Sequence, residues 1–346
     1  MGLEEYVAAA PKAELHLHLQ GAIRPVTLLE LARRHRVALP AEDLDGLRAW
    51  FQFRDFAHFV EVYAVLRSCL VEPGDFELVT YELGCELTAQ HVRYAEVTFT
   101  PGPEVYRGPR ETFFDGLTRG RQLVRHDLGV ELRWIFDIPR RTVGLYPDLP
   151  LADFITDSAI NGRNDGVVAL GLAGTEQGYP PEPFEPWFDR ARAAGLHSAP
   201  HAGETAGPAS IWGAINALGA ERLGHGVRAV EDTDLVAYLV THQVALEVCP
   251  TSNIRLGVYP SLDEHPLPRL HAAGVRVTVN TDTPAIFGTT LNSEAALLET
   301  AFNLPRQAVD EILLNAFQAS FLPPEERDAF VGSARAELAR QGGLPA

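Results

Sequence analysis

Residues 14–23 read ELHLHLQGAI. Leucine alternates with polar residues over 14–19, which is typical of a β-strand because successive side chains point to opposite faces. An open doubly wound sheet that binds dinucleotides carries a G-x-G-x-x-G turn after its first strand, and the single Gly21 cannot supply that turn. The stretch therefore favours a closed barrel over an open sheet.

Seven further β-rich runs follow, separated by segments long enough to hold helices. They are YAEVTFT (94–100), LRWIFDI (132–138), VVALGLAG (167–174), LHSAPHAG (196–203), RLGHG (222–226), ALEVCP (245–250) and VRVTVNTD (275–282). Helical patterns at 184–195, 208–220 and 232–243 lie between the later runs. Eight strands alternating with helices predict an α/β fold of the (β/α)8 TIM-barrel type.

We expect residues 1–346 to form one catalytic domain, since no repeat, low-complexity tract or linker marks a second one. A helical insertion is predicted at about 20–93, between the first two strands, and helices are predicted over 290–340. The insertion contains FRDFAHFVEVY (53–63), in which Phe56, Phe59, Val60 and Tyr63 form one apolar stripe on a helix. This segment is a candidate lid, with Phe56 and Phe59 expected to contact substrate; ordinary core packing is the alternative.

Charge and cysteine content narrow the class of protein. The 29 basic and 46 acidic residues give a net charge of −17, which disfavours nucleic acid and anionic membranes as partners. Three cysteines without paired spacing argue against a disulfide framework or a cysteine zinc cluster. No signal peptide or membrane span is readable, so we expect a cytoplasmic protein. The sequence carries no signal for an oligomeric state.

The first strand carries two candidate metal ligands. His16 and His18 fall on the same face of the strand, while the leucines at 15, 17 and 19 take the other face. A divalent metal relieves the repulsion between two buried imidazoles by binding both neutral rings. An isolated H-x-H pair is weak evidence, because many such pairs face solvent or are simply hydrogen-bonded.

Similar residues follow other strands: His201 in APHAGE, His225 in GHG and Asp282 in VNTDTP. In a parallel barrel all C-terminal strand ends open onto one mouth. Three histidines and one aspartate are nitrogen and oxygen donors suited to one zinc ion with an open position for water. Glu204, three residues after His201, is the candidate proton carrier beside such a water; a helix-capping glutamate is the alternative.

Several ordered motifs together resemble the adenosine deaminase family. They are PKAELHLHLQGAI, HSAPHAGET with a downstream RLGHG, LEVCPTSN, and HPLPRLHAAGVRVTVNTDTPAIFGTTLNSE, and the match runs from about Pro11 to the end of the chain. The resemblance implies a zinc-dependent (β/α)8 hydrolase that replaces the 6-amino group of a purine and releases ammonia. FRDFAHFVEVY, RWIFDIP and GLHSAPHAGETAGPASIW are most similar to the bacterial branch that includes aminodeoxyfutalosine deaminases.

The resemblance also assigns roles to particular positions. It implies that the zinc ligands are His16, His18, His201 and Asp282. Glu204 would protonate purine N1 and carry the water proton, and His225 would orient the attacking hydroxide and stabilise its charge. The backbone N–H of Gly174 would bind purine N3.

Two positions depart from the family pattern. The usual aspartate that accepts a hydrogen bond from the ribose 5′-hydroxyl is Gln20, and the usual aspartate facing purine N7 is Thr283. Both positions lie where base and ribose are read, so they leave open whether the substrate is adenosine or a 5′-modified adenosine such as aminodeoxyfutalosine or methylthioadenosine.

Three other functions compete with nucleoside deamination. The chain could act on adenine or another amino-heterocycle, although relatives acting on free adenine typically carry Glu at the Gln20 position. It could be a non-catalytic binding relative, but no expected ligand or glutamate is missing. It could hydrolyse an ester or amide, for which the same metal site would serve.

Overall fold

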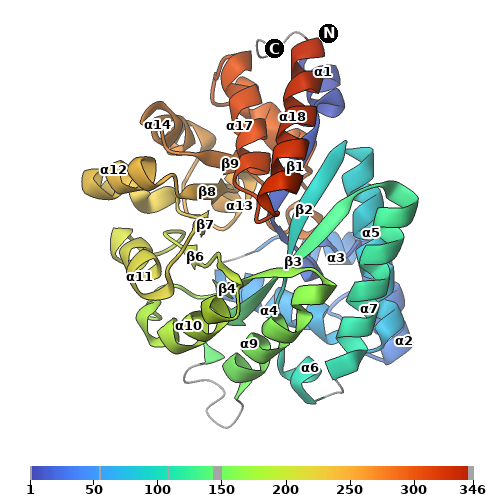
Figure 1. The fold of residues 1–346 in the computed structure, drawn as a ribbon. Helices are drawn as coiled ribbons and strands as arrows, with labels where there is room; N and C mark the ends of the chain where they lie inside the picture. Colours follow the sequence, from blue (N-terminus) through green and yellow to red (C-terminus); the bar gives the residue numbers. More distant parts are fainter. Residues whose placement is uncertain (1, 54–55, 108–109, 143–149, 342–346) are drawn as a thin grey trace.

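A barrel of parallel strands forms the centre of the protein in the computed structural model (Figure 1). The structure describes residues 2–53, 56–107, 110–142 and 150–341. The strands are β1 (Lys12–His18), β2 (Val92–Phe99), β3 (Glu131–Pro139), β4 (Val167–Ala173), β5 (His197–Ser198), β6 (His201–Ala202), β7 (Arg222–His225), β8 (Ala245–Val248) and β9 (Val277–Val279). Neighbouring strands pair in parallel from β1 to β5 and from β6 to β9.

The predicted strand at 196–203 is divided into β5 and β6. Pro200 has no N–H to donate to a neighbouring strand, so the regular pairing stops beside it. The backbone nevertheless continues the barrel, because the Ala199 N–H donates to Leu170 O (3.1 Å) and the Pro200 carbonyl accepts from the Gly224 N–H (3.0 Å). The two short pieces are therefore one barrel strand, which gives the predicted total of eight.

Backbone hydrogen bonds between β1 and the segment after β9 close the barrel. The His18 N–H donates to Asp282 O (2.8 Å), and the Asp282 N–H donates to His16 O (3.0 Å). Earlier along β1 the Asn280 side chain takes the place of backbone hydrogen bonds between the two segments. Its Oδ1 accepts from the N–H groups of Leu15 (2.9 Å) and His16 (3.2 Å). The closure confirms the (β/α)8 prediction.

Helices surround the strands (Figure 1). After β2 come α6 (Pro103–Arg107), α7 (Arg110–Leu123), a π-helical turn η2 (Val124–Leu128), α9 (Leu151–Asn161), the 3₁₀ turns η3 (Gly162–Asp165) and η4 (Glu182–Phe184), α10 (Glu185–Ala193), α11 (Pro208–Leu218), η5 (Val227–Glu231), α12 (Thr233–His242), α13 (Pro250–Arg255), η6 (Leu262–Glu264), α14 (Leu267–Ala272), α15 (Pro284–Phe287), α16 (Leu291–Thr300), α17 (Arg306–Gln318) and α18 (Pro324–Arg340). The helices predicted at 184–195, 208–220 and 232–243 are confirmed as α10, α11 and α12. The predicted C-terminal helices are α16, α17 and α18, and α17 packs on both β1 and β9.

The long connection between the first two barrel strands holds four helices after the short turn η1 (Gln20–Ala22). They are α2 (Pro25–His35), α3 (Leu44–Trp50), α4 (Phe56–Ser68) and α5 (Pro73–Ala89); a further helix, α1 (Leu3–Ala9), precedes β1. The last of the four, α5, packs against α7 and β2, so it is the first barrel helix and not part of an insertion. The inserted part is therefore α2 to α4. Within the described ranges no helix is long and apolar enough to cross a membrane.

The closure predicts a large stability cost for Asn280→Ala. Removing the amide strands two buried backbone N–H groups, so the free energy of unfolding should fall by about 2–4 kcal/mol. Thr278→Val is the control, because Thr278 Oγ1 accepts from Asn280 Nδ2 (2.9 Å) and donates to the Leu246 carbonyl (3.3 Å) but satisfies no backbone N–H, and its loss should cost about 1 kcal/mol. Urea unfolding measures both. Equal losses would show that Asn280 does not carry the closure.

Candidate active site

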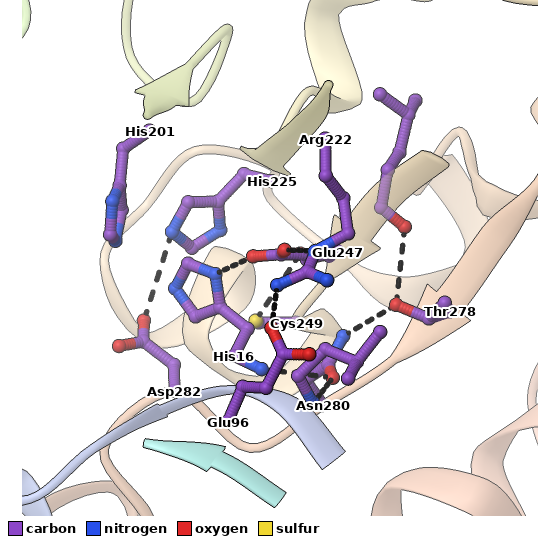
Figure 2. A network of polar contacts seen from close by, with 12 residues as sticks. His16, Glu96, His201, Arg222, His225, Glu247, Cys249, Thr278, Asn280 and Asp282 are labelled. Atoms are coloured by element: carbon purple, nitrogen blue, oxygen red, sulfur yellow. Dashed lines mark hydrogen bonds and ion pairs between the residues drawn. The ribbon is translucent and has the colours of Figure 1, made fainter. Parts of the chain in front are cut away.

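Four histidines and an aspartate meet at the carboxyl ends of the barrel strands. His16 and His18 lie on β1, His201 on β6 and His225 at the end of β7, and Asp282 follows β9. The ring centroid of His201 lies 4.5 Å from that of His16 and 5.2 Å from that of His18. Figure 2 shows His16, His201, His225 and Asp282 side by side. The structure thus brings these five predicted residues together.

Burial controls the charge of these groups. It lowers the pKa of His18 to about 3 and holds the pKa values of His16 and His201 well below the ordinary range, and the other nearby rings add to both shifts. Burial raises the pKa of Asp282 to about 6, which leaves it a carboxylate at neutral pH. The site therefore presents neutral imidazoles beside one negative charge.

A second layer of polar residues orients the ligand-type side chains. Glu247 Oε2 lies 2.8 Å from His16 Nδ1, and Arg222 bridges Glu247 to Glu96 below it (Figure 2). Because the Nδ1–H of His16 donates to Glu247, its Nε2 carries no proton and directs a lone pair toward the centre of the cluster. The Ser252 hydroxyl donates to Asp282 Oδ2 (2.6 Å), and Asp282 Oδ1 lies 3.5 Å from His18 Nε2.

The arrangement fits a divalent metal. Among the described residues, His16 Nε2, His18 Nδ1 and His201 Nδ1 are buried without a hydrogen-bond partner, and His18 Nε2 lies 3.2 Å from His201 Nε2. Two groups of donors, His16–His18–Asp282 and His16–His201–His225, each place ligand atoms within 4.8 Å of one another. Imidazole nitrogens held by carboxylates on the far side of the ring are typical of zinc centres.

Two site residues have a strained backbone. His225 (φ 59°) and Asp282 (φ 65°) both adopt the left-handed conformation, which non-glycine residues rarely take. Each is the last residue before the chain leaves the barrel, so the turn directs its side chain toward the centre. Such strain persists only where surrounding contacts enforce it and is concentrated at functional sites.

Glu204 lies in the loop after β6, with its Oε1 3.6 Å from His225 Nε2. The loop is held by Glu176, whose carboxylate accepts from four successive backbone N–H groups, those of residues 203 to 206, at 2.5–3.1 Å. Burial, followed by the charge of Glu176, raises the pKa of Glu204 to about 8. At neutral pH Glu204 therefore holds a proton that it can donate.

A cavity of about 180 Å³ lies above this cluster. Nine of the eleven residues predicted for the site line it: His18, Phe56, Phe59, Gly174, His201, Glu204, His225, Asp282 and Thr283. The Phe56 and Phe59 side chains extend from α4, which forms the apolar wall. The Thr283 hydroxyl is buried and has no hydrogen-bond partner among the described residues. Gly174 turns the chain at φ 91°, a conformation that favours glycine.

The two remaining residues lie behind the cavity wall. His16 is at the base of the cluster. Gln20 is buried, donates its amide to Thr100 O (3.1 Å) and accepts from the Tyr63 hydroxyl (3.0 Å), and it is Tyr63 that lines the cavity. Gln20 therefore acts on the cavity through Tyr63, and its predicted direct contact with ribose remains a prediction.

Sequence reasoning missed the supporting residues. A usable signal existed for Glu96, Arg222 and Glu247, because a charged residue inside an apolar strand run has to be paired when the strand is buried. Glu176 lies in a loop and Ser252 in the short helix α13, and the sequence pattern did not show that either segment packs against the site. Asp137, a buried carboxylate 3.8 Å from His201 Nδ1, was likewise missed, although LRWIFDI places it near a strand end.

Comparison with known proteins agrees with this geometry. The profile of the adenosine deaminase family matches residues 11–335. Aminodeoxyfutalosine deaminase of Streptomyces avermitilis is 43% identical over 321 residues, covering 92% of this chain and 89% of the relative. Adenine deaminase of Cupriavidus taiwanensis is 38% identical over 335 residues, covering 95% and 92%.

Solved structures give the same result. Adenine deaminase from Arthrobacter aurescens superposes with a TM-score of 0.86 at 32% identity, covering 96% of this chain and all of that one. An amidohydrolase from Burkholderia ambifaria with bound Zn superposes with a TM-score of 0.88 at 26% identity, covering 98% and 93%. The barrel, the converging histidines and the whole-length match together place the chain in the adenosine deaminase family.

Proposed function

We propose that this protein is a zinc-dependent hydrolase that removes the 6-amino group of a purine nucleoside. The observation that carries the proposal is one cavity lined by neutral histidines, a carboxylate and a glutamate that keeps its proton at neutral pH. A relative named aminodeoxyfutalosine deaminase, 43% identical along almost the whole chain, supports the same reaction class.

Four residues are proposed to hold one zinc ion: His16, His18, His201 and Asp282. When bound there, the ion supplies Lewis-acid activation of a water molecule. Glu247 orients His16 from behind, and Ser252 fixes Asp282 so that its other oxygen faces His18. Cys249 belongs to another possible donor group, but burial raises the pKa of its thiol well above the ordinary value, which disfavours the thiolate that binds metal.

Glu204 is proposed to carry the protons of the reaction. Its protonated carboxyl donates to purine N1, which makes C6 electrophilic toward the water oxygen. The resulting carboxylate accepts the proton of that water and delivers it to the departing amine. The C6–N6 bond then breaks and ammonia leaves. The proton that remains on the oxygen bound to C6 passes to the Glu204 carboxylate, which restores its protonated form and leaves the 6-oxo product. Because Glu176 fixes the backbone on which Glu204 sits, the carboxyl is positioned before substrate arrives.

Other cavity residues are proposed to place the base. His225 orients the attacking oxygen, the backbone N–H of Gly174 binds purine N3, and the Thr283 hydroxyl donates to N7. The unpartnered Thr283 hydroxyl supports this last contact, because a buried donor without a partner is costly unless a ligand satisfies it. A hydroxyl donates without first taking up a proton, which an aspartate at this position would require.

The cavity shape supports a nucleoside with a group added at the 5′ position. A second cavity of about 670 Å³ shares wall residues with the 180 Å³ cavity, on α4 and on the loops that carry Thr175 and Glu204. Helix α4, between the two, is proposed as a lid over the substrate. The neutral pair of Gln20 and Tyr63 leaves no carboxylate to demand a free 5′-hydroxyl.

Metal analysis of the purified protein should find one zinc ion per chain. His18→Ala should lose the metal, because it removes a donor from the centre. His225→Ala is the matched control: it removes a neighbouring imidazole that is not assigned as a ligand and should retain zinc while losing rate. Metal retained in the first variant and lost in the second would overturn the ligand assignment.

Glu204→Gln should reduce kcat by about 10²–10⁴-fold or more, because the amide keeps the shape of the side chain but cannot transfer a proton. Zinc content should not change. Glu185→Gln, at an exposed position at the start of α10, makes the same substitution outside the cavity and should have no effect. Steady-state release of ammonia gives kcat for the wild type and for both variants. A Glu204→Gln enzyme with wild-type kcat would show that another group carries the protons.

Wild type should accept 5′-deoxyadenosine and 5′-methylthioadenosine with kcat/KM at least equal to that for adenosine. Gln20→Asp should shift the ratio toward adenosine by about 10-fold, because the added buried charge behind Tyr63 favours a 5′ group that can donate a hydrogen bond on this side of the cavity. Gln20→Met removes the hydrogen bonds without adding charge and should leave the ratio unchanged. A strong wild-type preference for adenosine, unmoved by Gln20→Asp, would contradict the proposal.

Free adenine is the second candidate substrate, because two of the similar proteins are named adenine deaminases. Including adenine in the same panel separates the two candidates. A kcat/KM for adenine above that of every nucleoside would favour the free base.

A further inference from the structure

A chain of three buried hydrogen bonds leads from the start of α14 to His225. The Leu267 backbone N–H donates to His265 Nδ1 (3.2 Å). His265 Nε2 lies 3.1 Å from Asn253 Oδ1, and Asn253 Nδ2 lies 3.3 Å from His225 Nδ1. All three side chains are at most 3% exposed, so they are shielded from bulk solvent.

The backbone N–H at one end determines every proton along the chain. An amide N–H can only donate, so His265 Nδ1 must accept and its proton must sit on Nε2. That Nε2–H donates to Asn253 Oδ1, which turns the Asn253 NH₂ toward His225. His225 Nδ1 must then be an acceptor, and the proton of the neutral ring lies on Nε2. The reverse arrangement would leave two N–H donors facing each other at Leu267 and His265.

The fold holds the central asparagine in place. Asn253 is in α13, and its backbone carbonyl accepts from the N–H groups of Val258 (2.8 Å) and Tyr259 (3.2 Å). Leu267 is the first residue of α14, where a helix has N–H groups without intrahelical partners. The donor that starts the chain is therefore a fixed feature of the fold and not a mobile side chain.

We infer that Asn253 and His265 are positioning residues that lock His225 in its Nε2–H tautomer, so that His225 offers an N–H donor to the active-site cavity. This rests on the proposed function, in which His225 faces the attacking oxygen. Its Nε2 lines the cavity 3.6 Å from Glu204 Oε1 and 4.0 Å from Asp282 Oδ2. At these distances neither carboxyl group accepts a hydrogen bond from the Nε2–H, which stays available to the reacting oxygen.

Two consequences follow for the chemistry. His225 has no lone pair on Nε2, so it donates a hydrogen bond to the reacting oxygen and does not remove a proton from it. For the same reason it is not a metal ligand, although it lies among the candidate donors. A metal at Nε2 would force the proton onto Nδ1, opposite the Asn253 NH₂. The hydrogen bonds to Asn253 thus give His225 a different role from the proposed ligand His201: His225 donates a hydrogen bond and does not bind the metal.

Nitrogen-15 NMR of histidine-labelled, zinc-loaded enzyme tests the inference without turnover. In wild type, both His225 and His265 should show a protonated Nε2 and an unprotonated Nδ1. His225→Ala and His265→Phe assign the two sets of signals. A proton on His225 Nδ1 in the wild-type enzyme, or an Nε2 chemical shift typical of a metal-bound nitrogen, would overturn the inference.

Asn253→Asp replaces the hydrogen-bond donor that faces His225 Nδ1 with an acceptor, because a carboxylate can only accept. We expect a proton to appear on His225 Nδ1 and kcat to fall about 10–100-fold, the range typical when a residue orienting a functional side chain is changed. Zinc content should be retained and KM should change less than 3-fold. Asn315→Asp is the control: Asn315 donates to Val277 O (3.0 Å) on β9, outside the relay, so the His225 signals and kcat should match wild type.

The outcomes separate this inference from the proposed function. An Asn253→Asp enzyme with unchanged His225 signals or unchanged kcat would refute the relay while leaving deamination intact. A wild-type enzyme with the expected tautomers that deaminates no purine would refute the proposed function and leave the relay standing.

Discussion

Neutral imidazole rings packed face to edge at the barrel mouth are the constraint on which the rest of the site depends. Burial removes their charge, and the packing leaves ring nitrogens without donors or acceptors. A divalent cation can bind the lone pairs of several neutral imidazoles at once. The carboxylate of Asp282 would then balance part of its charge, and the same cation would supply the activation of water that the reaction class requires.

Each functional side chain is held by a partner from a different part of the chain. Glu247, supported by Arg222 and Glu96, orients His16 from inside the barrel (Figure 2). Glu176 fixes the loop that carries Glu204, and Asn253 fixes the ring of His225. The proposed ligand, the proposed proton carrier and the proposed hydrogen-bond donor are thus set independently. Such preorganisation is what allows a static site to stabilise a transition state.

The sequence predicted the fold and the central cluster because both follow from local pattern. Strand alternation placed His16 and His18 on one face, and barrel geometry brought His201, His225 and Asp282 to the same mouth. It could not predict the left-handed turns at His225 and Asp282, which tertiary contacts impose. Nor could it show that Gln20 bonds to Tyr63, since that contact joins η1 to α4 across a connection whose path is set by packing.

X-ray absorption at the zinc edge of the purified enzyme tests the proposed metal centre, because it reports the ligands of the metal without reference to substrate. We expect only nitrogen and oxygen neighbours, at about 2.0–2.2 Å, with scattering from about three imidazole rings. A sulfur neighbour at about 2.3 Å, which would implicate Cys249, or a spectrum with fewer than two imidazoles would contradict it.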